Sequence, residues 1–259
     1  EWSNRQFAFD AYTRSRSYFS NSEMAARGVP TGRELEILAP FRDRLPPELF
    51  TREYAPPTTD GSGNNRSNLR EAIRILDEAG WVMGPDGVRE KDGVRLSFEF
   101  VDSNPAFERW IAPFVQNLKR IGIDARFRVV DTAQLQNRLN NFDFDMTVQS
   151  FGQSNSPGNE QREYWGGEKA DMPGSRNYIG VKDPVVDALV EMIVGAPTRE
   201  ELVLRCRALD RVLQWGYYLV PNWHIAAWRV AYWDKFGIPD TPPPYGLPVE
   251  ETWWVKRHP

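Results

Sequence analysis

The chain is 259 residues long, which is enough to bury the core of one large domain or of two smaller ones. Its hydrophobic content of 41% and charged content of 26% are typical of soluble globular proteins, and no run of about 18 apolar residues predicts a membrane span. The formal net charge of −4 gives no general attraction to nucleic acid, so we expect no nucleic-acid partner.

The first 66 residues consist of a start that already reads as structured sequence and a proline-rich segment. The chain starts at Glu1 without a methionine or the basic and apolar regions of a signal peptide, so we expect a mature or truncated product. From Thr31 to Arg66 the sequence is punctuated by proline, in "APFRDRLPPEL" and "YAPPTTDGSGNNR". Because proline interrupts regular elements, this segment is predicted to be a long surface excursion.

From Asn68 onward, predicted helices alternate with predicted strands. The stretch "NLRE" resembles a capping box that starts a helix at Asn68, and Gly80 is expected to end this helix. A second helix over residues 107–121 is expected to end at Gly122. Alternation of apolar residues predicts three strands, over 94–100, 123–129 and 142–148. Strands that alternate with helices favour an α/β domain.

Two later helices and an aromatic run complete the chain. Asp183 and Thr198 are the predicted N-caps of these helices, and Cys206 lies on the apolar face of the second, where we expect a buried packing residue. After Tyr217 the sequence changes to the strand-like run "YYLVPNWHIAAWRVAYW" and a proline-rich tail. This shift predicts that the chain leaves the first domain near Leu219.

Motifs for catalysis are nearly absent. The sequence has no phosphate-binding loop, dinucleotide fingerprint, nucleophile elbow or HExxH motif, and two histidines with one cysteine cannot build a typical zinc site. We therefore expect no catalytic residue, no metal and no cofactor. His224, in the aromatic run, is expected to have a structural role or to line a cleft.

One short motif, "NFDFDM", keeps an enzymatic alternative open. Asp143 and Asp145 are two residues apart on a predicted strand, so both carboxylates project from one face and could bind a divalent cation with a nucleotide-sugar, as in DxD glycosyltransferases. The same alternation is typical of two solvent-facing acids opposite buried Phe142, Phe144 and Met146.

The order of the elements resembles that of a known family. It is similar to the C-terminal half of the extracellular solute-binding proteins (family 5) of oligopeptide and dipeptide ABC importers, in "NLREAIRILDEAGW", "DGVREKDGVRLSFEF", "LKRIGIDARFRVVD", "FDFDM", "NYIGVKDPVVDALV" and "YYLVPNW". Three further stretches resemble the YejA-like subgroup of this family: "SYFSNSEMAARGVPTG", "SPGNEQREYWG" and "PGSRNYIG". The resemblance covers nearly the whole chain.

This resemblance implies both a fold and a function. The implied fold is α/β, a lobe of the type II periplasmic-binding-protein kind with a mixed sheet flanked by helices. Residues 1–218 would form the second lobe and residues 219–259 would return as strands to the first lobe, most of which is missing from this chain together with the signal peptide. The implied function is non-catalytic: a peptide is held between two lobes in the periplasm and delivered to an inner-membrane ABC permease and its ATPase.

The polar stretch from Gln149 to Gly167 is expected to enter the cleft between the lobes. In many relatives the preceding strand ends in a Trp-x-x-Asp pattern whose aspartate is understood to hold the ligand's amino group, and the matching residues here are Phe151, Gly152, Gln153 and Ser154. The acid is absent, and either Gln153 or Ser154 takes its place. We predict either a ligand with a blocked or non-standard amino terminus or an amine held by another acid, such as Glu160 or Glu163.

The candidate ligand-binding residues carry polar or aromatic side chains, or are glycines that let the backbone approach a ligand. They are Tyr12, Arg14, Ser17, Tyr18, Phe151, Gly152, Gln153, Ser154, Asn155, Arg162, Trp165, Arg176, Asn177 and Trp223. Arg162 and Arg176 either receive a ligand carboxylate or form intramolecular ion pairs, and Trp165 and Trp223 either wall the pocket or pack in the core. Ten tryptophans also leave open a carbohydrate-binding module without a transport function.

Overall fold

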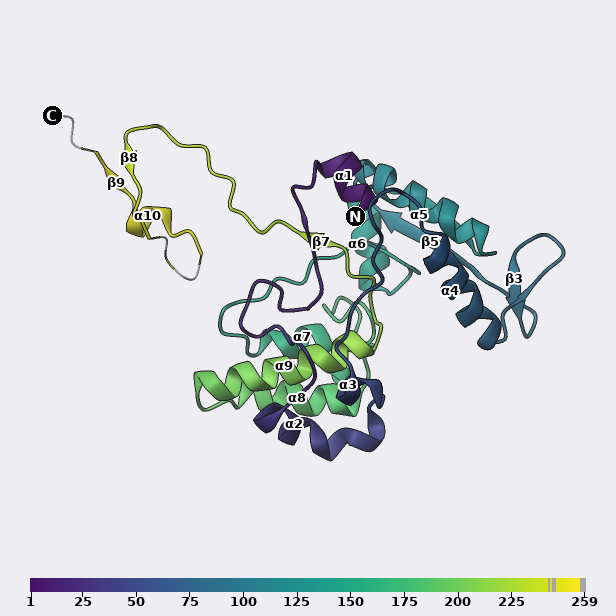
Figure 1. The fold of residues 1–259 in the computed structure, drawn as a ribbon, viewed down its shortest axis with the longest axis horizontal. Helices are drawn as coiled ribbons and strands as arrows, with labels where there is room; N and C mark the ends of the chain where they lie inside the picture. Colours follow the sequence, from purple (N-terminus) through teal and green to yellow (C-terminus); the bar gives the residue numbers. More distant parts are fainter. Residues whose placement is uncertain (242, 244–245, 257–259) are drawn as a thin grey trace.

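A computed structural model describes residues 1–241, 243 and 246–256. Two packed groups of elements, joined by irregular segments, lie beside each other, and the C-terminal part of the chain extends away from both (Figure 1). Among the helices of the described residues, none has both the length and the apolar character needed to cross a membrane.

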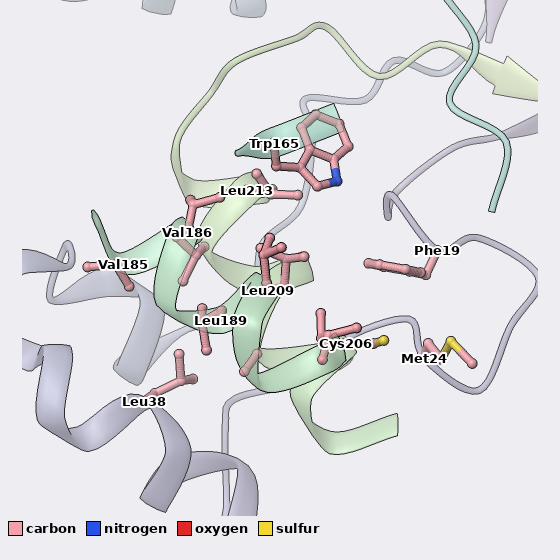
Figure 2. Close-up of a cluster of buried hydrophobic side chains, with 14 of the residues drawn as sticks. Phe19, Met24, Leu38, Trp165, Val185, Val186, Leu189, Cys206, Leu209 and Leu213 are labelled. Carbon is pink, nitrogen blue, oxygen red and sulfur yellow. The ribbon is translucent and has the colours of Figure 1, made fainter. Parts of the chain in front are cut away.

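The larger group is helical and contains the main core. It consists of α2 (Gly32–Leu38), α3 (Glu48–Thr51), α7 (Glu160–Trp165), α8 (Pro184–Val194) and α9 (Arg199–Trp215), with the short 3-10 turns η1 (Ala39–Arg44) and η3 (Gly167–Lys169) (Figure 1). The side chains of Leu189 and Leu209 lie between α8 and α9, Leu213 lies near Trp165, and Cys206 points toward Met24 and Phe19; all of them are essentially inaccessible to solvent (Figure 2). We refer to this group as the helical cluster.

Both predicted N-caps of the helical cluster are confirmed. The Asp183 carboxylate accepts a hydrogen bond from the Val185 amide at 2.8 Å, and the Thr198 hydroxyl accepts one from the Glu201 amide at 3.2 Å. These bonds satisfy amides that have no partner within the helix, which defines where α8 and α9 begin.

The prediction of a surface excursion between Thr31 and Arg66 is wrong for residues 32–51 and holds for residues 52–65, which are irregular and mostly exposed. The first part forms α2, η1 and α3, and Leu38 and Leu49 are fully buried in the main core. The prolines stand at the start of short helical turns, where a missing amide costs nothing, and not in loops alone.

The second group, the α/β cluster, surrounds a pair of parallel strands. β5 (Ser97–Asp102) and β6 (Asp124–Val129) pair in register from Ser97 with Asp124 to Asp102 with Val129. α5 (Glu108–Arg120) connects them and packs on them, burying Ile111 and Val115 against Phe100. The remaining elements are α4 (Arg66–Glu78), the antiparallel β2 (Val82–Met83), β3 (Arg89–Lys91) and β4 (Val94–Arg95), the 3-10 turn η2 (Pro105–Phe107) and α6 (Thr132–Asn140).

Several expectations for this cluster need correction. α4 begins at Arg66, so Asn68 lies inside the helix, and its amide donates to the Thr58 carbonyl at 3.1 Å instead of capping. The strand predicted over 94–100 is divided between β4 and β5 in different sheets. The strand predicted over 142–148 is reduced to one parallel bridge between Met146 and Phe100. The predicted helix ends hold, because Gly80 and Gly122 both have the positive φ typical of a helix terminus.

The N-terminal segment and the segment after α9 meet at a small ribbon. After α1 (Trp2–Ala8), β1 (Thr13–Arg14) pairs antiparallel with β7 (Trp223–His224). β7 is all the regular structure that forms in the predicted aromatic strand over 217–233, because the following residues have no sheet to join. Trp228 and Trp233 in this run are 73% and 78% exposed. β8 (Phe236–Gly237), α10 (Val249–Thr252) and β9 (Trp254–Val255) follow in the extended part (Figure 1).

Candidate ligand-binding site

A cavity of about 1360 Å³ lies where the helical cluster, the α/β cluster and the β1–β7 ribbon meet. Its wall contains Tyr54 and Tyr218 from the side of the helical cluster, and Phe107 and Phe114 from the side of the α/β cluster. Pockets for small ligands usually measure roughly 300–1,000 Å³. This cavity therefore has room for a ligand of several residues.

Three aromatic rings from distant parts of the chain stack in the wall of the cavity. The rings of Tyr12 and Trp223 are nearly parallel, at 7° and 5.9 Å between centroids, and Trp110 of α5 lies 4.3 Å from Trp223 at 27°. Phe7 of α1 contacts Trp110 edge to face at 5.2 Å. The pairing of β1 with β7 brings Tyr12 and Trp223 together, so the ribbon positions this aromatic wall.

A buried carboxylate in α9 holds another part of the wall. Asp210 is fully buried and accepts hydrogen bonds from the Ser17 hydroxyl at 2.7 Å, from the Tyr18 and Ala26 amides at 2.8 Å each, and from the Gln214 amide group at 3.0 Å. Burial raises the pKa of Asp210 to about 7, although these donors act in the opposite direction. Ser17, Tyr18 and Gln214 line the cavity, so Asp210 fixes the conformation of this wall from behind.

Half of the predicted site residues lie at this cavity. They are Tyr12, Arg14, Ser17, Tyr18, Phe151, Gln153 and Trp223. The structure thus brings the polar and aromatic residues of the first segment together with the start of the Gln149–Gly167 stretch and with β7. His224 also lines the cavity, and lining a cleft was one of the two roles expected for it. Its Nδ1 lies 3.0 Å from the Ser15 hydroxyl.

The two arginines considered for a ligand carboxylate are engaged within the protein and do not line the cavity. Arg162 forms a two-pronged ion pair with Glu191, at 2.6 Å and 2.5 Å. Arg176 donates to the Tyr164 hydroxyl at 2.9 Å and lies over the Tyr164 ring. The alternative of an ion pair within the protein therefore holds for Arg162, whereas Arg176 contacts the aromatic residue Tyr164 instead of an acid.

The other predicted residues also lie away from the cavity. Trp165 has no exposed surface and packs in the main core, because α7 turns its side chain toward α9 (Figure 2). Asn177 is equally buried, and its amide joins the carbonyls of Gly166 and Val181 at 3.0 Å and 2.9 Å. Gly152, Ser154 and Asn155 belong to the exposed part of the loop before α7.

Neither acid suggested as a substitute for the family aspartate lines the cavity. Glu160 accepts a hydrogen bond from the Gly158 amide at 3.0 Å, and Glu163 pairs with Lys169 at 3.1 Å. The contacts of Glu160 with Gly158 and of Glu163 with Lys169 hold both side chains close to α7.

The two acids of "NFDFDM" are exposed and have protein partners. Asp143 lies 3.3 Å from the Arg138 guanidinium, and Asp145 accepts from the Glu99 amide at 2.8 Å. Within the part of the chain that the structure describes, no three His, Cys, Asp or Glu side chains form a group suited to a metal ion.

Sequence reasoning missed the contribution of α5 to the site. Trp110, Phe107 and Phe114 fit the apolar periodicity of a packing face, which is where the sequence places them, yet all three line the cavity. Spacing along a helix cannot separate a side chain that faces a core from one that faces a cavity. Proline at position 113, inside α5, was the one local irregularity that set this helix apart.

The comparison with known families agrees with this architecture. Residues 43–172 match the model described as "Bacterial extracellular solute-binding proteins, family 5 Middle", and the chain belongs to this family, whose members bind substrates. Among individual proteins, it is 44% identical over 255 residues to the probable peptide-binding protein YejA of Agrobacterium fabrum. That match spans 98% of this chain but 42% of the relative, so the chain corresponds to about two fifths of the length of such relatives. The resemblance to the YejA-like subgroup is therefore confirmed.

Solved structures show the same fold at low sequence identity. A nickel ABC transporter protein from Bacillus halodurans superposes with a TM-score of 0.62 at 15% identity, over 86% of this chain and 39% of that one. The oligopeptide-binding protein AppA from Bacillus subtilis, in complex with a nonapeptide, gives 0.55 at 19% identity, over 86% of this chain and 45% of that one. These likenesses confirm the predicted α/β fold of the type II periplasmic-binding-protein kind.

Proposed function

We propose that this chain is a large part of a peptide-binding protein that serves an ABC importer. The observation that carries the proposal is the cavity of about 1360 Å³, which combines an aromatic wall with hydroxyl, amide and guanidinium groups. Such a lining suits a flexible polar ligand with varied side chains, because main-chain groups can hydrogen-bond while side chains contact aromatic rings. The name of the Agrobacterium relative and the nonapeptide bound to AppA support the same class of ligand.

The proposal includes a division of the chain between two lobes. Residues 1–218 form the second lobe and residues 219–259 run back to the first lobe, which belongs to the same precursor. The exposed aromatic residues after β7 support this division, since apolar surface of this extent normally meets a partner. The protein binds its peptide in the periplasm, delivers it to the inner-membrane permease and its ATPase, and carries out no catalysis.

The proposal is tested by identifying the ligand that the full-length protein carries when purified from its own cells. Mass spectrometry of the released small molecules is expected to find peptides. Recovery of glycans or of a metal complex instead of peptides would contradict the proposal. A titration with manganese and UDP tests the glycosyltransferase alternative and is expected to give no binding heat.

A further inference from the structure

A series of side-chain hydrogen bonds runs from the main core to the cavity. The Trp165 indole nitrogen donates to Gln161 Oε1 at 3.0 Å, and Gln161 Nε2 donates to Gln153 Oε1 at 2.6 Å. Trp165 and Gln161 have no exposed surface, while Gln153 lines the cavity. We call these three residues the amide relay.

The chemistry of its members fixes the direction of the amide relay. An indole nitrogen can only donate, so the atom of Gln161 that faces Trp165 must be the oxygen. Gln161 Nε2 also lies 3.3 Å from a carboxylate oxygen of Glu160, which can only accept. The side-chain amide of Gln161 therefore has only one possible orientation, in which its N–H group faces Gln153.

Gln153 in turn has one possible orientation. Its oxygen must accept from Gln161, so its Nε2 keeps its N–H groups available to donate. This nitrogen is buried and has no hydrogen-bond partner among the described residues. A buried donor without a partner is unfavourable. A hydrogen bond from this donor to an acceptor of a ligand therefore contributes more binding free energy than the same bond at a solvated surface.

We propose that Gln153 donates a hydrogen bond to an acceptor oxygen of the ligand and that this part of the cavity disfavours an ammonium group. The inference rests on the proposed function, peptide binding, and narrows its substrate class to peptides whose amino terminus is acylated. An ammonium at this point would meet a second donor, whereas an acyl carbonyl would satisfy the Gln153 amide.

The three acids in the cavity wall all make contacts within the protein. Glu1 accepts from the backbone amide and the hydroxyl of Thr59, at 3.1 Å and 2.9 Å. Asp145 accepts from a backbone amide, and Asp171 pairs with Lys182. None of these acids is hydrogen-bonded to Gln153 Nε2, which has no partner among the described residues.

The test uses the full-length protein and two mixtures of random pentapeptides made without lysine, one with free amino termini and one N-acetylated. Without lysine, the amino terminus is the only ammonium group in the mixture. The two mixtures compete for the protein, and mass spectrometry of the retained peptides gives the ratio of acetylated to free forms. The wild type is expected to favour the acetylated form by roughly tenfold or more.

The decisive variant is Gln153→Glu. Its carboxylate still accepts from Gln161, so the amide relay stays intact, while its second oxygen replaces the donor by an acceptor. We expect this variant to shift the ratio by at least tenfold toward free amino termini. Gln153→Met, of similar length but without polar atoms, is expected to discriminate little between the two forms.

Each outcome bears on a different statement. A wild type that prefers free amino termini, or a ratio that is the same in the wild type and Gln153→Glu, overturns the inference but leaves peptide binding in place. Retention of neither mixture by the wild type overturns peptide binding itself, and the inference with it. If Gln153→Glu does not fold, as judged by circular dichroism, the ratios of the wild type and Gln153→Met still decide.

Discussion

Replacing Asp210 by asparagine should change how the stability of the chain depends on pH. The pKa of this buried carboxylate is raised from 3.8 to about 7 in the folded protein because burial disfavours its charge. Between these values the folded state binds a proton that the unfolded state has lost. The free energy of unfolding contributed by this group is therefore highest below pH 4 and falls as the pH rises toward 7.

The size of the effect follows from the same two values. Between pH 5 and pH 7 the contribution of Asp210 should decrease by on the order of 2 kcal/mol. In Asp210→Asn the side chain stays neutral, so this slope should disappear. In the wild type the Tyr18 amide donates to Asp210. In the variant the asparagine side chain places an N–H group against that amide, and the loss of this hydrogen bond should lower the free energy of unfolding by about 1–3 kcal/mol at every pH.

Urea unfolding of the wild type and the variant at pH 5, 6 and 7 measures the difference. Glu34→Gln is a matched control, because Glu34 is a second buried carboxylate in contact with α9, paired with Arg211. That variant should be destabilised because it removes the partner of the buried Arg211 charge, and the slope contributed by Asp210 should remain. If the stability difference between the wild type and Asp210→Asn stays constant or grows from pH 5 to pH 7, the role given to burial at Asp210 is wrong.

Two further predictions concern the helical cluster. Leu209→Ala removes a fully buried side chain from the main core and should lower the free energy of unfolding by about 2–5 kcal/mol, measured by urea unfolding. A loss of less than about 1 kcal/mol would show that the neighbouring side chains fill the space that leucine leaves. Thr198→Ala removes the cap of α9 and should cost about 1 kcal/mol, whereas Thr198→Asn, which can also cap, should stay close to the wild type.

Local signals in the sequence were sufficient where a helix is defined by its own residues. Asp183 and Thr198 were identified as caps because the bond that each forms spans two or three residues. Gly80 and Gly122 were identified as ends because positive φ favours glycine. The position of Phe151 and Gln153 at the cavity followed from the family resemblance and not from periodicity.

Signals failed where distant contacts decide the structure. Proline content gave no hint that Leu38 and Leu49 reach the main core, since their partners in α8 and α9 lie far along the chain. Trp110 and Trp223 stack across more than a hundred residues, which no spacing rule can show. Ligand-binding roles were assigned to Arg162 although its partner Glu191 lies on the next helix.

The amide relay has a consequence for how specificity can evolve in this family. The orientation of the Gln153 amide depends, through Gln161, on Trp165, a residue that is buried in the main core. A change of Trp165 to phenylalanine removes the donor that holds Gln161, although the carboxylate of Glu160 still favours the same orientation. Loss of both contacts frees both amides to turn over. A substitution at a core position can thus change the hydrogen-bonding groups that the cavity wall presents while every residue of the wall stays the same.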